Sequence, residues 1–213
     1  MPVLNKGDSN MAIMPMAFSP STVRRRFEVV DEFTLGSGTF LTIYDSKTPF
    51  AAVIDASPSD IDGDVRHRVV ATLELCRPER FDGILSVKEF WQDSDALQVE
   101  GVVVQGSMQG FGLATRMYET LVLQKGITLM SDNTHYEGGK ALWQHIAAKS
   151  KKLQVFVLDS DEGIFYPYDG TKLRYDGACI REEDIWSVHP DTTHYGVILI
   201  AEDAEKIAAL TAA

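Results

Sequence analysis

A glycine-rich segment is the part of the sequence whose residue types point most directly to chemistry. It runs from Gln105 to Leu113 and carries glycines at positions 106, 110 and 112. Glycine lets a backbone approach an anion closely, and the first turn of a helix presents unpaired N–H groups and partial positive charge. Val102 to Thr120 is therefore predicted to form a strand, a phosphate-binding turn and a helix. The alternative is a tight strand-to-helix turn without a ligand.

Two common phosphate-binding motifs fit this turn poorly. A P-loop requires Lys followed by Ser or Thr after its last glycine, and Leu113 and Ala114 stand there instead. A dinucleotide fold places its glycines in the first strand–helix unit, with an acidic residue about 20 positions later. Asp132 meets the spacing, but the turn follows a long stretch of strand-like sequence. Its placement disfavours a dinucleotide site.

The segment resembles the GCN5-related N-acetyltransferase family, in which a central strand leads into a turn of the pattern Arg/Gln-x-x-Gly-x-Gly/Ala and then a long helix. Gly110, Phe111 and Gly112 match this pattern, whereas Ser107 stands where the family usually has Arg or Gln. The resemblance covers roughly residues 97–160 and looks closest to divergent, bacteriophage-type members. It implies an acyl-CoA acyltransferase fold with acetyl-CoA as acyl donor.

The resemblance also implies where the donor would bind. Backbone N–H groups of the central strand would polarise the thioester carbonyl, and the turn would hold the pyrophosphate. The donor-binding residues implied in this way are Val103, Val104, Gln105, Gln109, Gly110, Phe111, Gly112 and Leu113. Trp143 occupies the position where the family often has a tyrosine that protonates the departing thiolate, and an indole does not supply that proton.

Carboxylates near the turn are the candidates for activating an amine acceptor. Glu100 lies in the apolar strand, where apolar surroundings would raise its pKa toward that of a base; the alternative is an exposed or ion-paired side chain. Asp132 follows the next strand and could bind the amine, or could be a turn or helix-capping residue. His135 is a further candidate base. Tyr136 is a candidate proton donor, with Tyr118, Tyr166 and Tyr168 as alternatives.

Other chemistries have little support in the sequence. The five histidines show no metal-ligand spacing, and no Gly-x-Ser-x-Gly motif indicates a hydrolase. Cys76 and Cys179 are far apart, which favours reduced thiols in a cytoplasmic protein. The net charge of −11 disfavours a nucleic-acid partner. No stretch has the length of a transmembrane helix, so no membrane partner is expected.

The elements predicted around the turn form a mixed α/β (α+β) order: β-rich, then strand–helix–strand–helix–strand, then β-rich again. Leu113, Met117 and Leu121 recur at helical spacing, and Gly126 follows as a helix terminator. Strands are predicted at 27–33, 39–44, 50–54, 68–75, 97–105, 127–130 and 153–158, and a strand or short helix at 84–91. A second helix is predicted at 138–149 and a short one at 204–210, with further strands at 164–168, 172–175 and 195–201.

This order predicts a flexible arm at 1–22, an acetyltransferase-like domain at 23–160 and a β-rich extension at 161–213 packed on the same domain. The sequence thus predicts an N-acetyltransferase that moves an acetyl group from coenzyme A directly to the primary amine of a small molecule or a protein. The alternative is a catalytically degenerate binding or structural protein of the same fold, with the β-rich tail as a docking surface or a homodimer interface.

Overall fold

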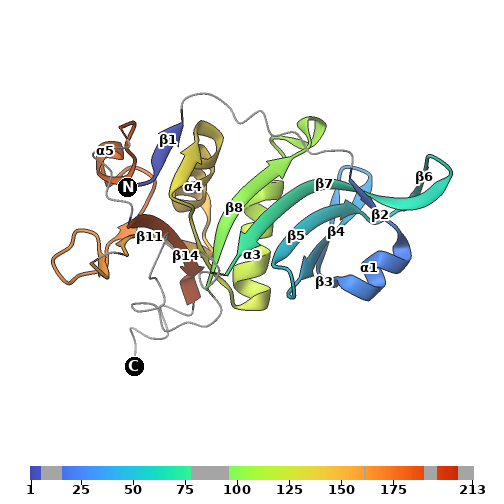
Figure 1. Cartoon of the computed structure of the whole chain (residues 1–213), viewed down its shortest axis with the longest axis horizontal. Helices are drawn as coiled ribbons and strands as arrows, with labels where there is room; N and C mark the ends of the chain where they lie inside the picture. The colour runs from blue at the N-terminus through green and yellow to red at the C-terminus, as the bar shows by residue number, and fades with distance from the viewer. Residues whose placement is uncertain (6–15, 78–95, 161, 190–195, 206–213) are drawn as a thin grey trace. The chain divides into compact units, whose positions relative to one another are not determined.

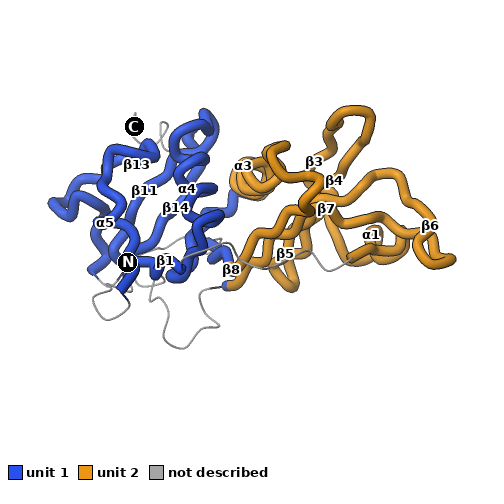
Figure 2. The backbone as a smooth tube through the Cα atoms, turned by 90° about the horizontal axis from the view of Figure 1, so that it is seen from above, with its two compact units in different colours: residues 1–9, 77–99, 126–213 blue, residues 10–76, 100–125 orange. Residues whose placement is uncertain are grey.

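A computed structural model describes residues 1–5, 16–77, 96–160, 162–189 and 196–205 of the 213-residue chain. The chain forms two compact units (Figure 2). Unit 1 contains residues 1–9, 77–99 and 126–213, and unit 2 contains residues 10–76 and 100–125. Each unit contains segments that are separated in the sequence. The division predicted at residues 22 and 160 instead cuts the chain into three consecutive segments.

Unit 2 is built on antiparallel strands that follow one another along the chain (Figure 1). Alternating and β-branched residues favour these strands, and the turn at Gly36 connects the first two. The N–H of Gln105 donates to the carbonyl of Val70 at 2.9 Å, beside the strand that leads into the glycine-rich turn. The strands lie in the order β3 (Glu28–Leu35), β4 (Gly38–Asp45), β5 (Phe50–Asp55), β7 (Asp64–Cys76) and β8 (Ala96–Val104).

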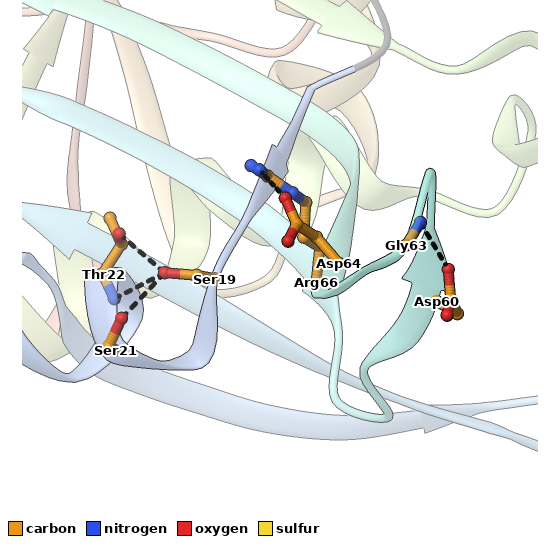
Figure 3. Close-up of polar contacts among 7 residues, drawn as sticks. All are labelled: Ser19, Ser21, Thr22, Asp60, Gly63, Asp64 and Arg66. Atoms are coloured by element: carbon orange, nitrogen blue, oxygen red, sulfur yellow. Dashed lines mark hydrogen bonds and ion pairs between the residues drawn. The ribbon is translucent and has the colours of Figure 1, made fainter.

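Two helices cover the sheet of unit 2. Helix α1 (Pro20–Arg26) begins after Ser19, whose hydroxyl accepts the N–H of Thr22 at 3.1 Å as an N-cap (Figure 3). It packs Val23 and Phe27 into a cluster with Ile43, Ala52, Ile54 and Val69. Helix α3 (Leu113–Lys125) contacts β3, β5 and β7. The predicted helix and its end at Gly126, which has a φ of 68°, are confirmed.

A short hairpin in unit 2 lies between the strands predicted at 50–54 and 68–75, in a segment for which no strand is predicted. Strand β6 (Ser59–Ile61) pairs with the start of β7, with Ile61 opposite Asp64. Asp62 and Gly63 connect the strands with φ angles of 55° and 85°, the conformation that Asp-Gly adopts in tight hairpins. The Asp60 carboxylate accepts the Gly63 N–H at 2.9 Å, as Figure 3 shows.

Unit 1 contains the mixed part of the sheet. The first residues of β8 pair in parallel with β9 (Thr128–Met130), from Ala96 opposite Thr128 to Gln98 opposite Met130. The last strand, β14 (Val197–Asp203), lies between β9 and β11 (Leu153–Asp159) and is antiparallel to both. Short strands β12 (Ile164–Phe165) and β13 (Arg174–Tyr175) also pair with β11.

Helix α4 (Glu137–Lys149) packs beside this sheet through Trp143, Ile146 and Ala147, which are all buried. It contacts β11, β10 (Thr134–Tyr136) and β1 (Val3–Asn5). Gly177, with a φ of 92°, lies so close to α4 that an added Cβ would be 2.9 Å from the Gln144 carbonyl oxygen. The positive φ angle and the lack of space for a Cβ both require glycine at position 177.

The chain start forms a strand within the range predicted as an arm. Strand β1 pairs in parallel with β10, and the Ser187 carbonyl accepts the Leu4 N–H at 2.8 Å. Ser187 follows the short helix α5 (Glu182–Ile185). These pairings join residues far apart in sequence, which the composition of the segment does not indicate.

The fold is thus α+β with a mixed sheet, as the order of predicted elements indicated. Seven predicted strands, at 27–33, 39–44, 50–54, 68–75, 97–105, 127–130 and 153–158, are confirmed with shifted ends. Those at 164–168, 172–175 and 195–201 are shorter or shifted, at Ile164–Phe165, Arg174–Tyr175 and Val197–Asp203. The element predicted at 84–91, and most of the helix predicted at 204–210, lie outside the described residues.

Candidate functional site

The glycine-rich turn lies in unit 2, directly after β8. A single 3₁₀ turn, η2 (Gly106–Met108), follows the strand. Gly110 and Gly112 then adopt φ angles of 80° and 74°, with the exposed Phe111 between them. A Cβ at either glycine would meet no atom within 4 Å. The backbone conformation and not the packing therefore requires glycine at both positions, and it leaves their backbone open to a ligand.

The turn delivers the chain into the N-terminus of α3. The first intrahelical hydrogen bond joins the Arg116 N–H to the Gly112 carbonyl at 2.9 Å. The N–H groups of Leu113, Ala114 and Thr115 precede it and have no carbonyl partner one turn earlier in α3. Together with the helix dipole, they give the turn the polarity of an anion site.

Side chains hold the turn and helix in place. Gln109 donates its amide to the Val104 carbonyl at 3.4 Å and so spans the turn. Arg116 forms a 2.7 Å ion pair with Asp31 and lies 4.0 Å over the ring of Phe33, which ties α3 to β3. Leu113, Met117 and Leu121 are buried beneath the helix. The helix that carries the N–H groups therefore rests on a packed base.

The other residues that are expected to bind the acyl donor belong to the same unit. Val103, Val104 and Gln105 are half-buried at the end of β8. Ser107 is exposed on η2, where the family pattern usually has a longer Arg or Gln. Glu100 lies earlier on β8 and is exposed. The expected apolar enclosure of its carboxylate is therefore absent, in agreement with the exposed alternative.

Asp132 lies in unit 1, two residues after β9. Its side chain is half-buried, and Oδ1 accepts the N–H of Asn133 at 2.7 Å and the side-chain amide of Gln98 at 3.1 Å. Its backbone carbonyl accepts hydrogen bonds from the Ser131 hydroxyl and from His135 Nε2, both at 3.0 Å. Asp132 is thus held from several sides and does not cap a helix, since α4 begins at Glu137.

His135 is buried on β10 and is a structural member of this arrangement. The indole N–H of Trp186 donates to His135 Nδ1 at 2.9 Å. The proton of the neutral ring therefore lies on Nε2, which donates to the Asp132 carbonyl. Burial lowers the pKa of His135 to about 4, although the hydrogen bond to the Asp132 carbonyl opposes this change. Both ring nitrogens are occupied, so His135 is not placed as a general base.

The candidate proton donors occupy different settings. Tyr136, on β10 in unit 1, is 42% exposed. Tyr118 is buried in α3, and its burial raises its pKa well above the usual range, as suits a packing residue. Burial raises the pKa of Tyr168 to about 12. Trp143 is 3% exposed and belongs to the core of unit 1, so its position on α4 is a packing position.

Two residues that contact the candidate site residues, Gln98 and Trp186, are not predicted from the sequence. Gln98 lies in a strand predicted from its apolar residues, and no pattern in the sequence indicates a role for Trp186. Gln98 is buried opposite Met130. In the sequence it interrupts an apolar run, and an exposed glutamine would interrupt the run in the same way. The contact of Trp186 with His135 spans 51 positions, and no local pattern indicates it.

The described residues show little other chemistry. They contain no group of three or more His, Cys, Asp or Glu side chains placed to hold a metal ion. Cys76 is buried and Cys179 is exposed, and neither forms a disulfide. No helix within the described ranges is long and apolar enough to cross a bilayer.

Comparison with known proteins gives no relative from which to transfer a function. No family model matches the chain, and neither a curated protein nor a solved structure matches it. The functional argument therefore depends on the residues themselves.

Proposed function

We propose that the chain is an N-acetyltransferase of the GCN5-related type, which uses acetyl-CoA as acyl donor and a primary amine as acceptor. The observation that carries this proposal is the turn after β8. Two glycines with positive φ angles precede the first N–H groups of α3, and a Cβ added at either glycine would meet no atom within 4 Å. A pyrophosphate is the ligand that such a turn favours within this family pattern.

The sheet supports the same proposal. The parallel pairing of β8 with β9 ends at Gln98 and Met130, although β8 continues to Val104. In the family that the sequence resembles, the sheet splays after these two strands, and the thioester lies against the end of the central strand. The N–H of Val103 or Val104 would donate a hydrogen bond to the thioester carbonyl oxygen and so polarise the carbonyl.

The reaction would proceed by direct transfer. The neutral amine attacks the carbonyl carbon, a C–N bond forms, and the C–S bond breaks to release the coenzyme A thiolate. The amine proton passes to Glu100, directly or through water, and the thiolate takes a proton from solvent. Glu100 is exposed and is therefore accessible to amines in solution.

One observation favours the alternative, a binding protein of this fold without turnover. Trp143 stands at the family's tyrosine position and is packed in the core, so it supplies no proton to a thiolate. The two proposals differ in one outcome: both allow acetyl-CoA to bind, but only the enzyme forms an acetylated amine and free thiol.

The test begins with acetyl-CoA binding, measured by calorimetry on the full chain. The Gly110→Leu variant places a side chain in the open turn and should abolish binding. The matched control is Gly36→Leu, which imposes comparable backbone strain in the same unit, at a φ of 60° and with open space around it. Equal affinity in both variants would contradict the assignment of the turn. Release of free thiol with a panel of primary amines then separates enzyme from binding protein.

A further inference from the structure

The ring of Phe111 is displayed on the surface of the glycine-rich turn. The residue is 56% exposed, and its two neighbours in the chain are glycines, which carry no side chain to cover the ring. The other phenylalanines of the described residues are all buried or half-buried. Packing therefore accounts for those rings, whereas the fold of unit 2 leaves most of the Phe111 ring in water.

The position of the ring, and not its exposure alone, indicates a ligand. Single apolar side chains are common on protein surfaces. Phe111, however, lies between Gly110 and Gly112, whose φ angles of 80° and 74° and open surroundings leave the backbone accessible. The first N–H groups of α3 follow directly. A ligand that places a phosphate on this backbone would therefore lie beside an exposed aromatic face.

Cationic side chains contribute little to this turn. Helix α3 carries two of them, and both are engaged by carboxylates of β3. Arg116 pairs with Asp31 at 2.7 Å, and Lys125, the last residue of the helix, pairs with Glu28 at 2.8 Å. Ser107, exposed on η2, carries no charge. A phosphate in the turn would depend on backbone N–H groups, so a nucleotide would gain its further affinity through its base.

We propose that Phe111 stacks on the adenine ring of the acyl donor and so selects a donor that carries a nucleotide. Coenzyme A joins its adenine to the pyrophosphate through one ribose, which places the base within reach of a residue in the same turn. An aromatic side chain and a purine both present flat faces, and such stacking strengthens binding by about tenfold per base. This inference rests on the proposed function for the pyrophosphate in the turn, but nucleotide binding can be measured without an acyl group.

The experiment measures the affinity of the full chain for adenosine 3′,5′-bisphosphate, the nucleotide half of coenzyme A, by calorimetry. We expect saturable binding by the wild type. Phe111→Ala should weaken this binding about tenfold, the loss typical of one stack between a base and an aromatic ring. Val65→Ala is the matched control, because Val65 is a 58% exposed apolar residue in the same unit, and it should leave the affinity unchanged.

The Phe111→Trp variant separates stacking from a structural effect of substitution. The larger ring should preserve the affinity for the bisphosphate. Its fluorescence, measured relative to the wild type, should be quenched saturably by the bisphosphate but not by inorganic pyrophosphate, which has no base. Circular dichroism establishes that each variant is folded. If Phe111→Ala does not fold, the quenching in Phe111→Trp still tests the contact.

Three results would overturn the proposal: no binding of the bisphosphate by the wild type at millimolar concentration, equal affinities in folded Phe111→Ala and Val65→Ala variants, or no quenching in Phe111→Trp. Calorimetry with acetyl-CoA on the same samples separates this failure from that of the proposed function. Acetyl-CoA binding that Phe111→Ala leaves unchanged contradicts only the stacking. Binding of the bisphosphate that depends on Phe111, in a chain that binds no acetyl-CoA, contradicts only the transferase assignment.

Discussion

Acid should destabilise unit 1 through His135. The pKa of this buried ring is lowered from an ordinary 6.5 to about 4 in the folded chain. Between these pH values the unfolded chain binds a proton that the folded chain does not bind. The stabilisation from the neutral ring is therefore fully present above about pH 6.5 and is lost as the pH falls toward 4.

The size of this loss follows from the two pKa values. Each pH unit in the window removes up to about 1.4 kcal/mol from the free energy of unfolding, and the whole window removes about 3 kcal/mol. That is a large part of the total of about 5–15 kcal/mol that is typical of a folded protein. Protonation would also break the Trp186 hydrogen bond, since Nδ1 would no longer accept it.

The assay is urea unfolding at pH 7, 6, 5 and 4.5, followed by tryptophan fluorescence, because Trp143 and Trp186 both lie in unit 1. Comparison with His135→Gln isolates this residue from the carboxylates, which titrate in both proteins. The stability advantage of the wild type at pH 7 should shrink steadily by about 2–3 kcal/mol by pH 4.5. A difference that stays constant across the series would refute the reasoning.

Four further predictions concern the stability of the two units. Gly177→Ala should lower the free energy of unfolding of unit 1, measured by urea, by about 2–4 kcal/mol, because the added Cβ clashes with backbone and the positive φ angle is strained. Gly170→Ala is the control, because its φ is 90° in open space, and it should cost only about 1 kcal/mol. Thr42→Val should leave unit 2 equally stable or about 1 kcal/mol more stable, because its buried hydroxyl makes no hydrogen bond. Ser131→Ala should instead cost about 1–3 kcal/mol in unit 1, because its hydroxyl accepts a backbone N–H. Deletion of residues 1–5 removes β1 and should lower the thermal midpoint of unit 1, and an unchanged midpoint would contradict its pairing with β10.

Local patterns predicted the elements that carry the turn. The four-residue recurrence of Leu113, Met117 and Leu121, with Gly126 after it, fixed α3 closely, because burial on one face and a terminating glycine are both local signals. The hairpin at Asp62-Gly63 has an equally local signal, although polar residues that are typical of a loop surround it. Its two-residue connection is recognisable by the Asp-Gly pair alone.

The supporting residues of the candidate site could not be predicted in the same way. A glutamine at position 98 reads equally well as an exposed residue, and only the parallel pairing of β8 with β9 brings it to Asp132. The His135–Trp186 contact and the pairing of β1 with β10 join segments that are distant in sequence. Such contacts depend on tertiary packing, which leaves no periodic trace in the chain.

Acetyl-CoA binding to the full chain tests the central claim most directly. We predict saturable binding by calorimetry, and an increase in stability of about 1.4 kcal/mol at tenfold excess over Kd. The Gly110→Leu variant should lose both effects, while Gly36→Leu retains the affinity. Absence of binding by the wild type at millimolar acetyl-CoA would contradict the assignment of the turn after β8 as an acyl-CoA site.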